Sequence, residues 1–294
     1  MTVKDFPEEC WESVFRFLGL GHRHLNGHRE GLLRQISQSG LELDLINLSN
    51  QRTFPVDGLR ELGSNKKKLT VLICSNIGSL RDSHLVIIAY CFPLLDKLDI
   101  SFPLNSQASD FGVLRLSSML ENLRKINISG IASAIRLRPG LSSIAFNIEK
   151  KRIHGPGLTL TPIDLNLIDS FRTLKRLTDI DLSNSVISDE FLFAVAEGAG
   201  LLLKKLILQD CCNCTFSGIS YVLSKCQSVQ CLDLRKVDFL SDQCISKLSV
   251  FLLSLTTINL SGCCQLTNST FFILTRNCPL HSQKVIALVV PLNK

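Results

Sequence analysis

The stretch "LTTINLSGCCQLTNSTFFILTRNC", residues 255–278, contains the pattern that decides the fold of this chain. Its first part follows the form L-x-x-L-x-L, in which apolar and polar positions alternate as in a strand with one buried face. Its second part, after a polar turn, is an apolar run suited to a helix. The stretch predicts a strand–turn–helix unit, which cannot bury its own apolar face and needs similar units stacked beside it.

The unit recurs along most of the chain with a nearly constant period of about 26 residues, which is typical of a repeat protein. The interval from Leu95 to Leu123 is slightly longer than the others. The interval from Leu123 to Leu177 leaves room for two units of nearly the usual length, and "LSSIAFN" from Leu141 is a candidate for an off-register one. The copies begin at Leu43, Leu69, Leu95, Leu123, Leu177, Leu203, Val229 and Leu255.

Each unit also carries a signal for the start of its helix. Asp82, Asp242 and Asn268 fall at the same repeat position, just before an apolar segment, and their side chains suit the capping of a helix. The sequence therefore predicts an α/β solenoid of strand–turn–helix units.

Composition and charge exclude several classes of protein. Of 294 residues, 45% are apolar and 20% charged, with a mean hydropathy of +0.23, which predicts a folded chain. The net charge of +6 is dispersed, with one tight run at Lys66–Lys68, so we expect no nucleic-acid partner. No apolar run is long enough for a transmembrane helix, since the nearest, Val285–Leu292, is short and contains Pro291. We therefore expect no membrane partner.

The first residues, MTVKDFPEEC, are polar and acidic and lack the apolar core of a secretory signal. We therefore expect the protein in the cytoplasm, the nucleus or both. In such a reducing compartment its twelve cysteines are expected to remain thiols.

The units resemble cysteine-containing leucine-rich repeats, whose unit has the form L-x-x-L-x-L-x-x-C-x-x-L-[ST]-[DN] and a similar length. The resemblance covers residues 43–280, with residues 131–176 poorly matched and residues 281–294 departing from the pattern. It implies a horseshoe-shaped solenoid over residues 41–294. The unit that matches completely has Leu255, Ile258, Leu260, Cys263, Leu266, Thr267 and Asn268 at the defining positions.

The segment "LQDCCNCTFSG", residues 208–218, clusters three cysteines that could suggest a metal or redox site. Cys211 and Cys212 lie two whole repeats before Cys263 and Cys264. A repeat position predicts this spacing, whereas a structural zinc site needs four converging ligands. We therefore predict buried thiols that pack as small apolar side chains, and no metal.

The segment "FPEECWESVFRFL", residues 6–18, predicts a short amphipathic helix. One interpretation is a cap that covers the first repeat, as solenoids require. The segment also resembles the first half of an F-box, L-P-x-E-x-x-x-x-[IV]-F-x-x-L. The matching residues are Phe6, Pro7, Glu9, Val14, Phe15 and Leu18.

The F-box resemblance implies binding to a Skp-type adaptor, and through it membership of a cullin–RING ubiquitin ligase, with the repeats selecting the protein to be ubiquitinated. The second half of an F-box, with a pattern like L-x-L-V-C-K-x-[WF], has no counterpart here. We therefore treat residues 1–40 as a partial F-box-like helical segment ahead of the solenoid.

Alternate positions of each strand face away from the core, so they form the predicted concave binding surface. Lys204, Lys205, Arg235 and Lys236 add a modest basic patch that could meet an acidic segment of a partner. The predicted substrate-binding residues are Asp181, Lys205, Ile207, Gln209, Asp233, Arg235 and Asn259.

The sequence thus predicts a substrate-recognition subunit of a Skp–cullin–F-box ubiquitin ligase that promotes proteasomal degradation. It predicts no enzyme and no cofactor, because polar residues recur with the repeat and do not cluster as catalytic groups must. The alternative is a non-catalytic interaction scaffold whose incomplete F-box cannot bind the adaptor. A third class, a metal or redox protein built on the cysteines, requires bound metal.

Overall fold

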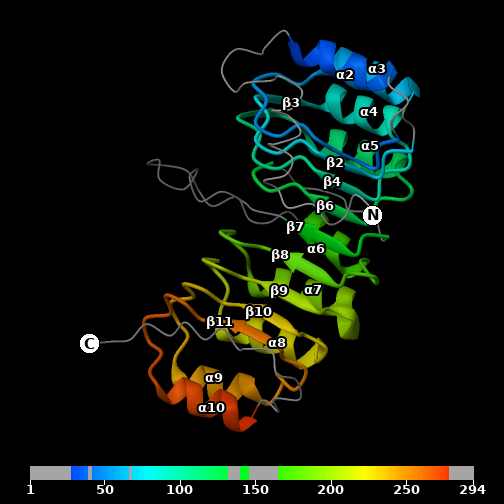
Figure 1. The fold of residues 1–294 in the computed structure, drawn as a ribbon. Helices are drawn as coiled ribbons and strands as arrows, with labels where there is room; N and C mark the ends of the chain where they lie inside the picture. The colour runs from blue at the N-terminus through cyan, green and yellow to red at the C-terminus, as the bar shows by residue number, and fades with distance from the viewer. Residues whose placement is uncertain (1–27, 39–41, 66–67, 132–139, 146–164, 278–294) are drawn as a thin grey trace, which may run out of the picture.

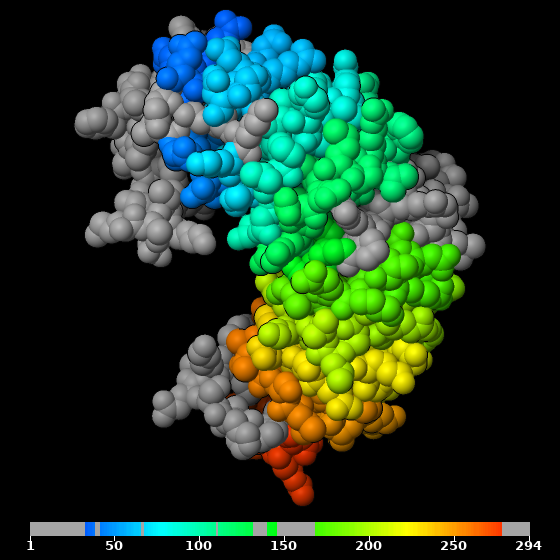
Figure 2. Space-filling model, turned by 90° about the vertical axis from the view of Figure 1, so that its right-hand side faces the viewer, coloured from blue at the N-terminus to red at the C-terminus, as the bar shows by residue number. Residues whose placement is uncertain are grey.

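The computed structural model describes residues 28–38, 42–65, 68–131, 140–145 and 165–277, and it is an α/β structure. Strand–turn–helix units are stacked so that the strands form a parallel sheet and the helices form a layer beside it (Figure 1). Figure 2 shows the stack as an arc. The predicted α/β class and repeated unit are confirmed for the described residues.

The main sheet has nine strands in the described part of the chain, all parallel to their neighbours. They are β1 (Leu45–Asn47), β2 (Val71–Ile73), β4 (Lys97–Asp99), β6 (Lys125–Asn127), β7 (Ser143–Ala145), β8 (Asp179–Asp181), β9 (Lys205–Ile207), β10 (Cys231–Asp233) and β11 (Thr257–Asn259). A smaller parallel pair joins β3 (Ser79–Arg81) to β5 (Asn105–Gln107).

One helix follows most strands. These helices are α2 (His28–Gln38), α3 (Val56–Asn65), α4 (Asp82–Cys91), α5 (Asp110–Met119), α6 (Leu165–Arg172), α7 (Asp189–Ala199), α8 (Phe216–Lys225), α9 (Asp242–Ser249) and α10 (Ser269–Asn277), with a short 3-10 turn at Gly200–Leu202. None of these described helices has the length and apolar character needed to cross a membrane.

The core lies between the sheet and the helices. The middle residue of every main-sheet strand is buried, and so are most of the apolar residues on either side of it in the repeat pattern, although Leu43 and Leu48 beside β1 are only partly buried. For example, Leu203, Leu206 and Leu208 are each 0% exposed. Because side chains alternate across a strand, the first and last residues of each strand face away from this core. We call the surface that they form the open face of the sheet.

The predicted off-register unit is present. "LSSIAFN" supplies β7, which pairs with β6 on one side and β8 on the other. The middle section of the chain divides unequally, because the interval from Ile144 to Ile180 is twice as long as the interval from Ile126 to Ile144. Residues 146–164, between β7 and β8, lie outside the described part of the chain.

After eight of the described main-sheet strands, the third residue beyond the strand is left-handed and turns the chain toward the helix. In six of the eight turns the amide of this residue donates to a described residue of the next unit, as from Asn50 to the Ser75 carbonyl (3.0 Å) and from Lys236 to the Ser261 carbonyl (3.0 Å). Glycine and asparagine tolerate a positive φ, whereas other side chains are strained by it. The residues are Asn50, Asn76, Phe102, Gly130, Asn184, Asp210, Lys236 and Gly262, with φ from 49° to 77°.

Two of the three predicted helix starts differ by one residue from the structure, whereas Asn268 directly precedes α10. Asp82 and Asp242 are the first helical residues and do not cap their own helices, whose N-cap residues are Arg81 and Ser241. The aspartates instead accept hydrogen bonds from a serine or threonine just before the helix of the next unit. Asp82 accepts from the Ser109 amide (2.7 Å) and hydroxyl (2.6 Å).

The same bond between units occurs twice more in the described chain. Asp189 accepts from the Thr215 amide (2.7 Å) and hydroxyl (2.6 Å), and Asp242 accepts from the Thr267 amide (3.0 Å) and hydroxyl (2.5 Å). Carboxylates also favour the first turn of a helix, where the helix dipole is positive. The aspartate therefore stabilises its own helix by interacting with the helix dipole, and it links this helix to the next unit by accepting hydrogen bonds.

Helix α2 packs against α3 at the N-terminal end of the described stack. Leu33 is buried between them, Arg34 Nε lies 3.0 Å from Glu61 Oε2, and Ser37 Oγ donates to the Glu61 carbonyl (2.8 Å). Thus residues 28–38, on the N-terminal side of the predicted boundary at residue 40, form a helical layer of the stack.

Candidate functional site

The open face of the sheet is the candidate functional site, and strand pairing fixes its geometry. Backbone pairing aligns equivalent side chains in two rows that cross the strands. The first row contains Lys97, Lys125, Ser143, Asp179, Lys205, Cys231 and Thr257. The second contains Asp99, Asn127, Ala145, Asp181, Ile207, Asp233 and Asn259.

The predicted substrate-binding residues occupy this surface. Asp181, Ile207, Asp233 and Asn259 lie in the second row, Lys205 lies in the first, and Gln209 and Arg235 lie in the turns that follow β9 and β10. These positions agree with the alternation from which they were predicted. Whether they bind a partner stays a prediction.

Most acidic groups in the second row are engaged in holding the turn. Asp99 Oδ1 accepts from the Ser101 amide (2.9 Å) and hydroxyl (2.6 Å), and Asp181 Oδ1 accepts in the same way from Ser183 (3.0 and 2.6 Å). Asn259 makes the same pair of bonds with an amide oxygen, so the turn requires an acceptor and not a charge. The second carboxylate oxygen of an aspartate at this position remains for another partner.

Arg235 does not contribute a free positive charge to the predicted basic patch. Its guanidinium Nη2 lies 2.8 Å from Asp233 Oδ2, and its Nε donates to both oxygens of the same carboxylate (3.0 and 2.9 Å). Hydrogen bonds to Asp233 and its negative charge outweigh a small desolvation and raise the pKa of Arg235. The patch is therefore weaker than the sequence predicted, because the side chains of Asp233 and Arg235 neutralise each other.

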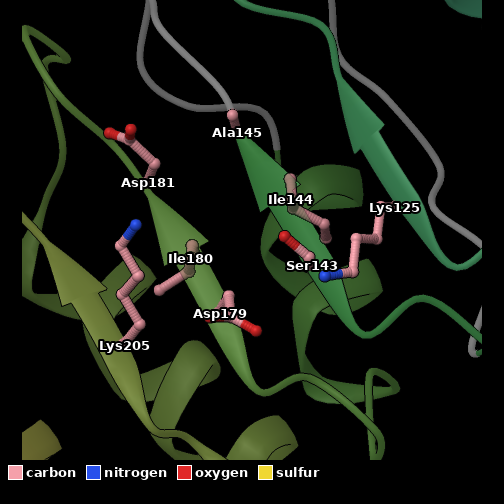
Figure 3. Close-up of a pocket in the computed structure, with 8 residues that line it drawn as sticks. All are labelled: Lys125, Ser143, Ile144, Ala145, Asp179, Ile180, Asp181 and Lys205. Atoms are coloured by element: carbon pink, nitrogen blue, oxygen red, sulfur yellow. The ribbon is translucent and has the colours of Figure 1, made fainter. Parts of the chain in front are cut away.

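A hollow of about 250 Å³ lies on the open face across β6, β7, β8 and β9 (Figure 3). The hollow forms over β7 because Ser143 and Ala145 are smaller than their neighbours in the two rows. Its other lining residues are Lys125, Ile144, Asp179, Ile180, Asp181 and Lys205. Figure 3 shows Lys125 and Lys205 on opposite sides of the β7–β8 pair, with the Lys125 amine turned toward Ser143 and the Lys205 amine toward Asp181.

The charges around the hollow are not paired with each other. Asp179 Oδ2 accepts from the Thr178 hydroxyl (2.6 Å) and Asp181 Oδ1 accepts from Ser183, but neither carboxylate lies within ion-pair distance of a cation in the described chain. Lys125 and Lys205 are exposed and likewise lack an ion-pair partner among the described residues. The hollow thus offers two aspartates between two lysines.

The cysteines follow the repeat, and Cys211 and Cys263 pack in the core as predicted, whereas Cys212 is half-buried and Cys264 is exposed, so the prediction of buried thiols is wrong for these two. Cys211 Sγ donates to the Leu182 carbonyl (2.9 Å), and Cys263 Sγ donates to the equivalent Leu234 carbonyl (3.1 Å). Burial raises the pKa of Cys226 to about 12. In the described chain no three histidine, cysteine or acidic side chains are grouped as metal ligands would be.

The predicted adaptor-binding residues, Phe6, Pro7, Glu9, Val14, Phe15 and Leu18, lie outside the described residues. The adaptor prediction therefore rests on the sequence. Sequence reasoning also missed six lining residues of the hollow, Lys125, Ser143, Ile144, Ala145, Asp179 and Ile180. The available signal was "LSSIAFN" itself, because a strand with two small outward residues between longer neighbours must leave a depression.

Comparisons with known proteins support the fold. No protein-family model matches the chain, and no curated protein matches it in sequence. A chain from the crystal structure of the Rad7 and Elc1 complex in yeast is similar over 90% of this chain and 77% of that one, with a TM-score of 0.53 and 17% identity. The fold is of the leucine-rich-repeat type.

A protein from Bacteroides fragilis covers 88% of this chain and 71% of its own, with a TM-score of 0.48 and 15% identity. At 17% identity, the likeness to the yeast structure shows the leucine-rich-repeat type of fold and not the activity.

Proposed function

We propose that this protein is the substrate-recognition subunit of a Skp–cullin–F-box type ubiquitin ligase. The observation that carries the proposal is the order of its parts. An F-box-like segment at residues 6–18 precedes a repeat stack whose sheet has an open face with unpaired charges. The similar yeast fold was solved as a complex of two proteins, Rad7 and Elc1, which fits a role in assembly.

In this role the protein is not a catalyst. The F-box-like segment binds a Skp-type adaptor, and the open face binds the substrate protein. Holding the substrate near activated ubiquitin raises its effective concentration, which accelerates transfer without a catalytic group on this chain. The ubiquitinated substrate then becomes a target for proteasomal degradation. The proposed location is the cytoplasm, the nucleus or both, where such ligases and reduced thiols coexist.

The test is co-purification of the full chain with a Skp-type adaptor and cullin, beside a known F-box protein as the positive control. Val14→Ala combined with Phe15→Ala should reduce adaptor capture by at least about tenfold, because truncating an apolar anchor of an interface typically costs about 2 kcal/mol or more. Phe272→Ala is the matched control, since this phenylalanine is 69% exposed on α10 at the far end of the stack. Failure of the unaltered chain to capture the adaptor would contradict the proposal.

One observation favours a second candidate, an interaction scaffold without an adaptor. The second half of the F-box pattern has no counterpart, and residues 28–38, which follow the F-box-like segment, form α2 and pack on α3 through Leu33 and Arg34. A chain that binds protein partners through its open face but never captures the adaptor would establish this alternative.

A further inference from the structure

The hollow at β6–β9 lies at the centre of the open face and differs from the rest of it. Elsewhere on this face, Asp233 is neutralised by Arg235, and Asp99 accepts from Asn127 Nδ2 (3.0 Å) as well as from Ser101. Asp179 and Asp181 have no such cation or amide partner across the strands in the described chain. The hollow is therefore where charges on this face remain available to a partner.

The size of the hollow indicates the kind of group that enters it. Pockets for small organic ligands usually enclose roughly 300–1,000 Å³ and bury most of the ligand. The hollow has about 250 Å³, which is below this range. It suits one long side chain of a bound protein better than a separate small molecule.

The two aspartates select the chemistry of that side chain. They lie at the two ends of the short strand β8 and point to the same face, so their backbone positions are about 6.6 Å apart. A planar guanidinium with five donors can bond to two carboxylates at once, whereas a lysine ammonium acts as a point charge. An arginine that enters the hollow would bond to both Asp179 and Asp181 after their side chains, which Figure 3 shows turned toward opposite ends of β8, rotate toward it.

The two lysines favour acidic residues on either side of the arginine in the bound segment. Lys125 on β6 and Lys205 on β9 are separated by three strand spacings, or about 14 Å. In an extended segment laid across the strands, residues i, i+2 and i+4 face the same way, and the outer two are about 13 Å apart. Acidic side chains at i and i+4 would thus meet the lysines while the residue at i+2 enters the hollow.

We propose that the hollow binds an extended segment of a partner protein with the pattern acidic-x-Arg-x-acidic. This inference deepens the proposed function and rests on it only in assigning a protein partner to the open face. Charge complementarity of this kind gives specificity and register more than raw affinity. A segment with the signs reversed would place like charges together at all three contacts.

The test is selection of random nonapeptides, displayed on phage, against the immobilised full chain. Enriched peptides should carry the pattern Glu-x-Arg-x-Glu or its aspartate equivalents. Their enrichment on the double variant Asp179→Asn and Asp181→Asn should be at least about tenfold lower than on the unaltered chain. These variants should fold, because asparagine keeps the acceptor oxygen and Asn259 makes the same turn bonds that Asp181 makes. An unfolding temperature equal to that of the unaltered chain would confirm that the variants fold.

Two further variants complete the design. Lys125→Gln combined with Lys205→Gln should remove the preference for flanking acids and leave the arginine. Glu121→Gln combined with Glu190→Gln, both exposed acids outside the open face, is the charge-matched control and should leave enrichment unchanged. Peptides of another charge pattern, equal enrichment on the aspartate variant, or no enrichment at all would each overturn the inference.

Adaptor capture by the same variants separates this inference from the proposed function. If the variants lose the peptides and keep the adaptor, both proposals stand. If the unaltered chain selects the peptides and never captures the adaptor, the proposed ligase role fails while the peptide site stands. If it captures the adaptor and selects no such peptides, only the inference about the hollow fails.

Discussion

Removing the Asp242 carboxylate should loosen the last described unit of the stack. Asp242 Oδ1 accepts from the Thr267 amide (3.0 Å) and the Thr270 hydroxyl (2.5 Å), and Oδ2 accepts from the Thr267 hydroxyl (2.5 Å). In Asp242→Ala all three donors lose their acceptor. Thr267 is exposed and can turn to water, but Thr270 is fully buried, so its hydroxyl would remain unpaired.

The magnitude follows from this difference in exposure. An unpaired buried polar group costs about 1–3 kcal/mol, and hydrogen bonds to a charged group that can be replaced by water contribute less than their usual value of about 1.5–3 kcal/mol. We therefore expect Asp242→Ala to lower the unfolding free energy of the terminal units by about 2–4 kcal/mol. Asp238→Ala, an exposed aspartate in the turn before α9, should cost less than about 0.5 kcal/mol.

The effect should depend on pH in a defined direction. Burial by itself would raise the pKa of Asp242, but hydrogen bonds from Thr267 and Thr270 outweigh it and hold the pKa below its usual 3.8. A carboxylate whose pKa is depressed on folding contributes stability that is complete above the unfolded pKa and is lost as the pH falls through the folded one. The stability difference between the unaltered chain and Asp242→Asn should therefore shrink below about pH 4.

Hydrogen exchange is the appropriate assay, because units of a repeat protein need not unfold together. The Thr267 amide and the amides of α10 should exchange faster in Asp242→Ala, whereas amides of α4 and α5 should not change. Urea titration followed by circular dichroism supplies the overall free energy. Equal protection of α10 in Asp242→Ala and Asp238→Ala would refute the assignment of a fastening role to Asp242.

Three other changes test separate features. Gly218→Ala should lower the unfolding free energy by about 1–2 kcal/mol in urea titration, because a Cβ there would collide with the Asp189 carboxylate of the preceding unit. Lys236→Asn should raise it by about 0.5–1 kcal/mol, since lysine is strained at φ 57° and asparagine tolerates it. An aromatic disulfide reagent at about pH 8 should modify the exposed Cys264 of the native chain and leave Cys226, which is buried with a pKa raised to about 12, unmodified until urea is added.

Each of these predictions has a specific contradicting result. An unfolding free energy that is unchanged in Gly218→Ala would mean that the Asp189 carboxylate moves aside without a cost in free energy. A destabilised Lys236→Asn protein would mean that the lysine makes a compensating contact, and Lys247→Asn on the exposed face of α9 serves as its control. Modification of Cys226 as fast as Cys264 would contradict its burial in the native core.

The regular period of the repeat made most of the fold predictable. It places equivalent leucines in register, and that register is what the parallel pairing of strands uses, from Leu45 opposite Val71 to Asp233 opposite Asn259. The division of the middle section was harder to predict. Two units of nearly the usual length were expected there, whereas the interval from β7 to β8 is twice as long as the interval from β6 to β7. Residue spacing alone cannot reveal an unequal division.

The candidate site was predictable in part for a similar reason. Alternation along a strand placed Asp181 and Lys205 on the open face, but contacts between side chains follow from geometry that spacing does not contain. The pairing of Arg235 with Asp233 joins a turn residue to a strand residue, so it became visible only with the side chains in place. The hollow arises because Ser143 and Ala145 are short, and it could be recognised only once the off-register β7 was placed between β6 and β8.

The bond from each helix start to the next unit limits which repeats can be exchanged. Each of two aspartates faces a glycine in the helix of the next unit: Asp82 faces Gly112, and Asp189 faces Gly218. The glycines have no side chain, which leaves room for the carboxylate. Helix α8 begins with Phe216 and brings no acid, and the next unit has Cys244 at the glycine position.

Neighbouring units are therefore matched pairs, in which the residue that begins one helix determines what the next can carry three positions after its cap. Duplication, deletion or grafting of a unit would separate such pairs unless the boundary were moved to keep them together. A recombinant stack that preserves the leucine period but joins an acid-bearing unit to one with a side chain at the glycine position should assemble poorly, unless that side chain, like Thr270, donates to the acid.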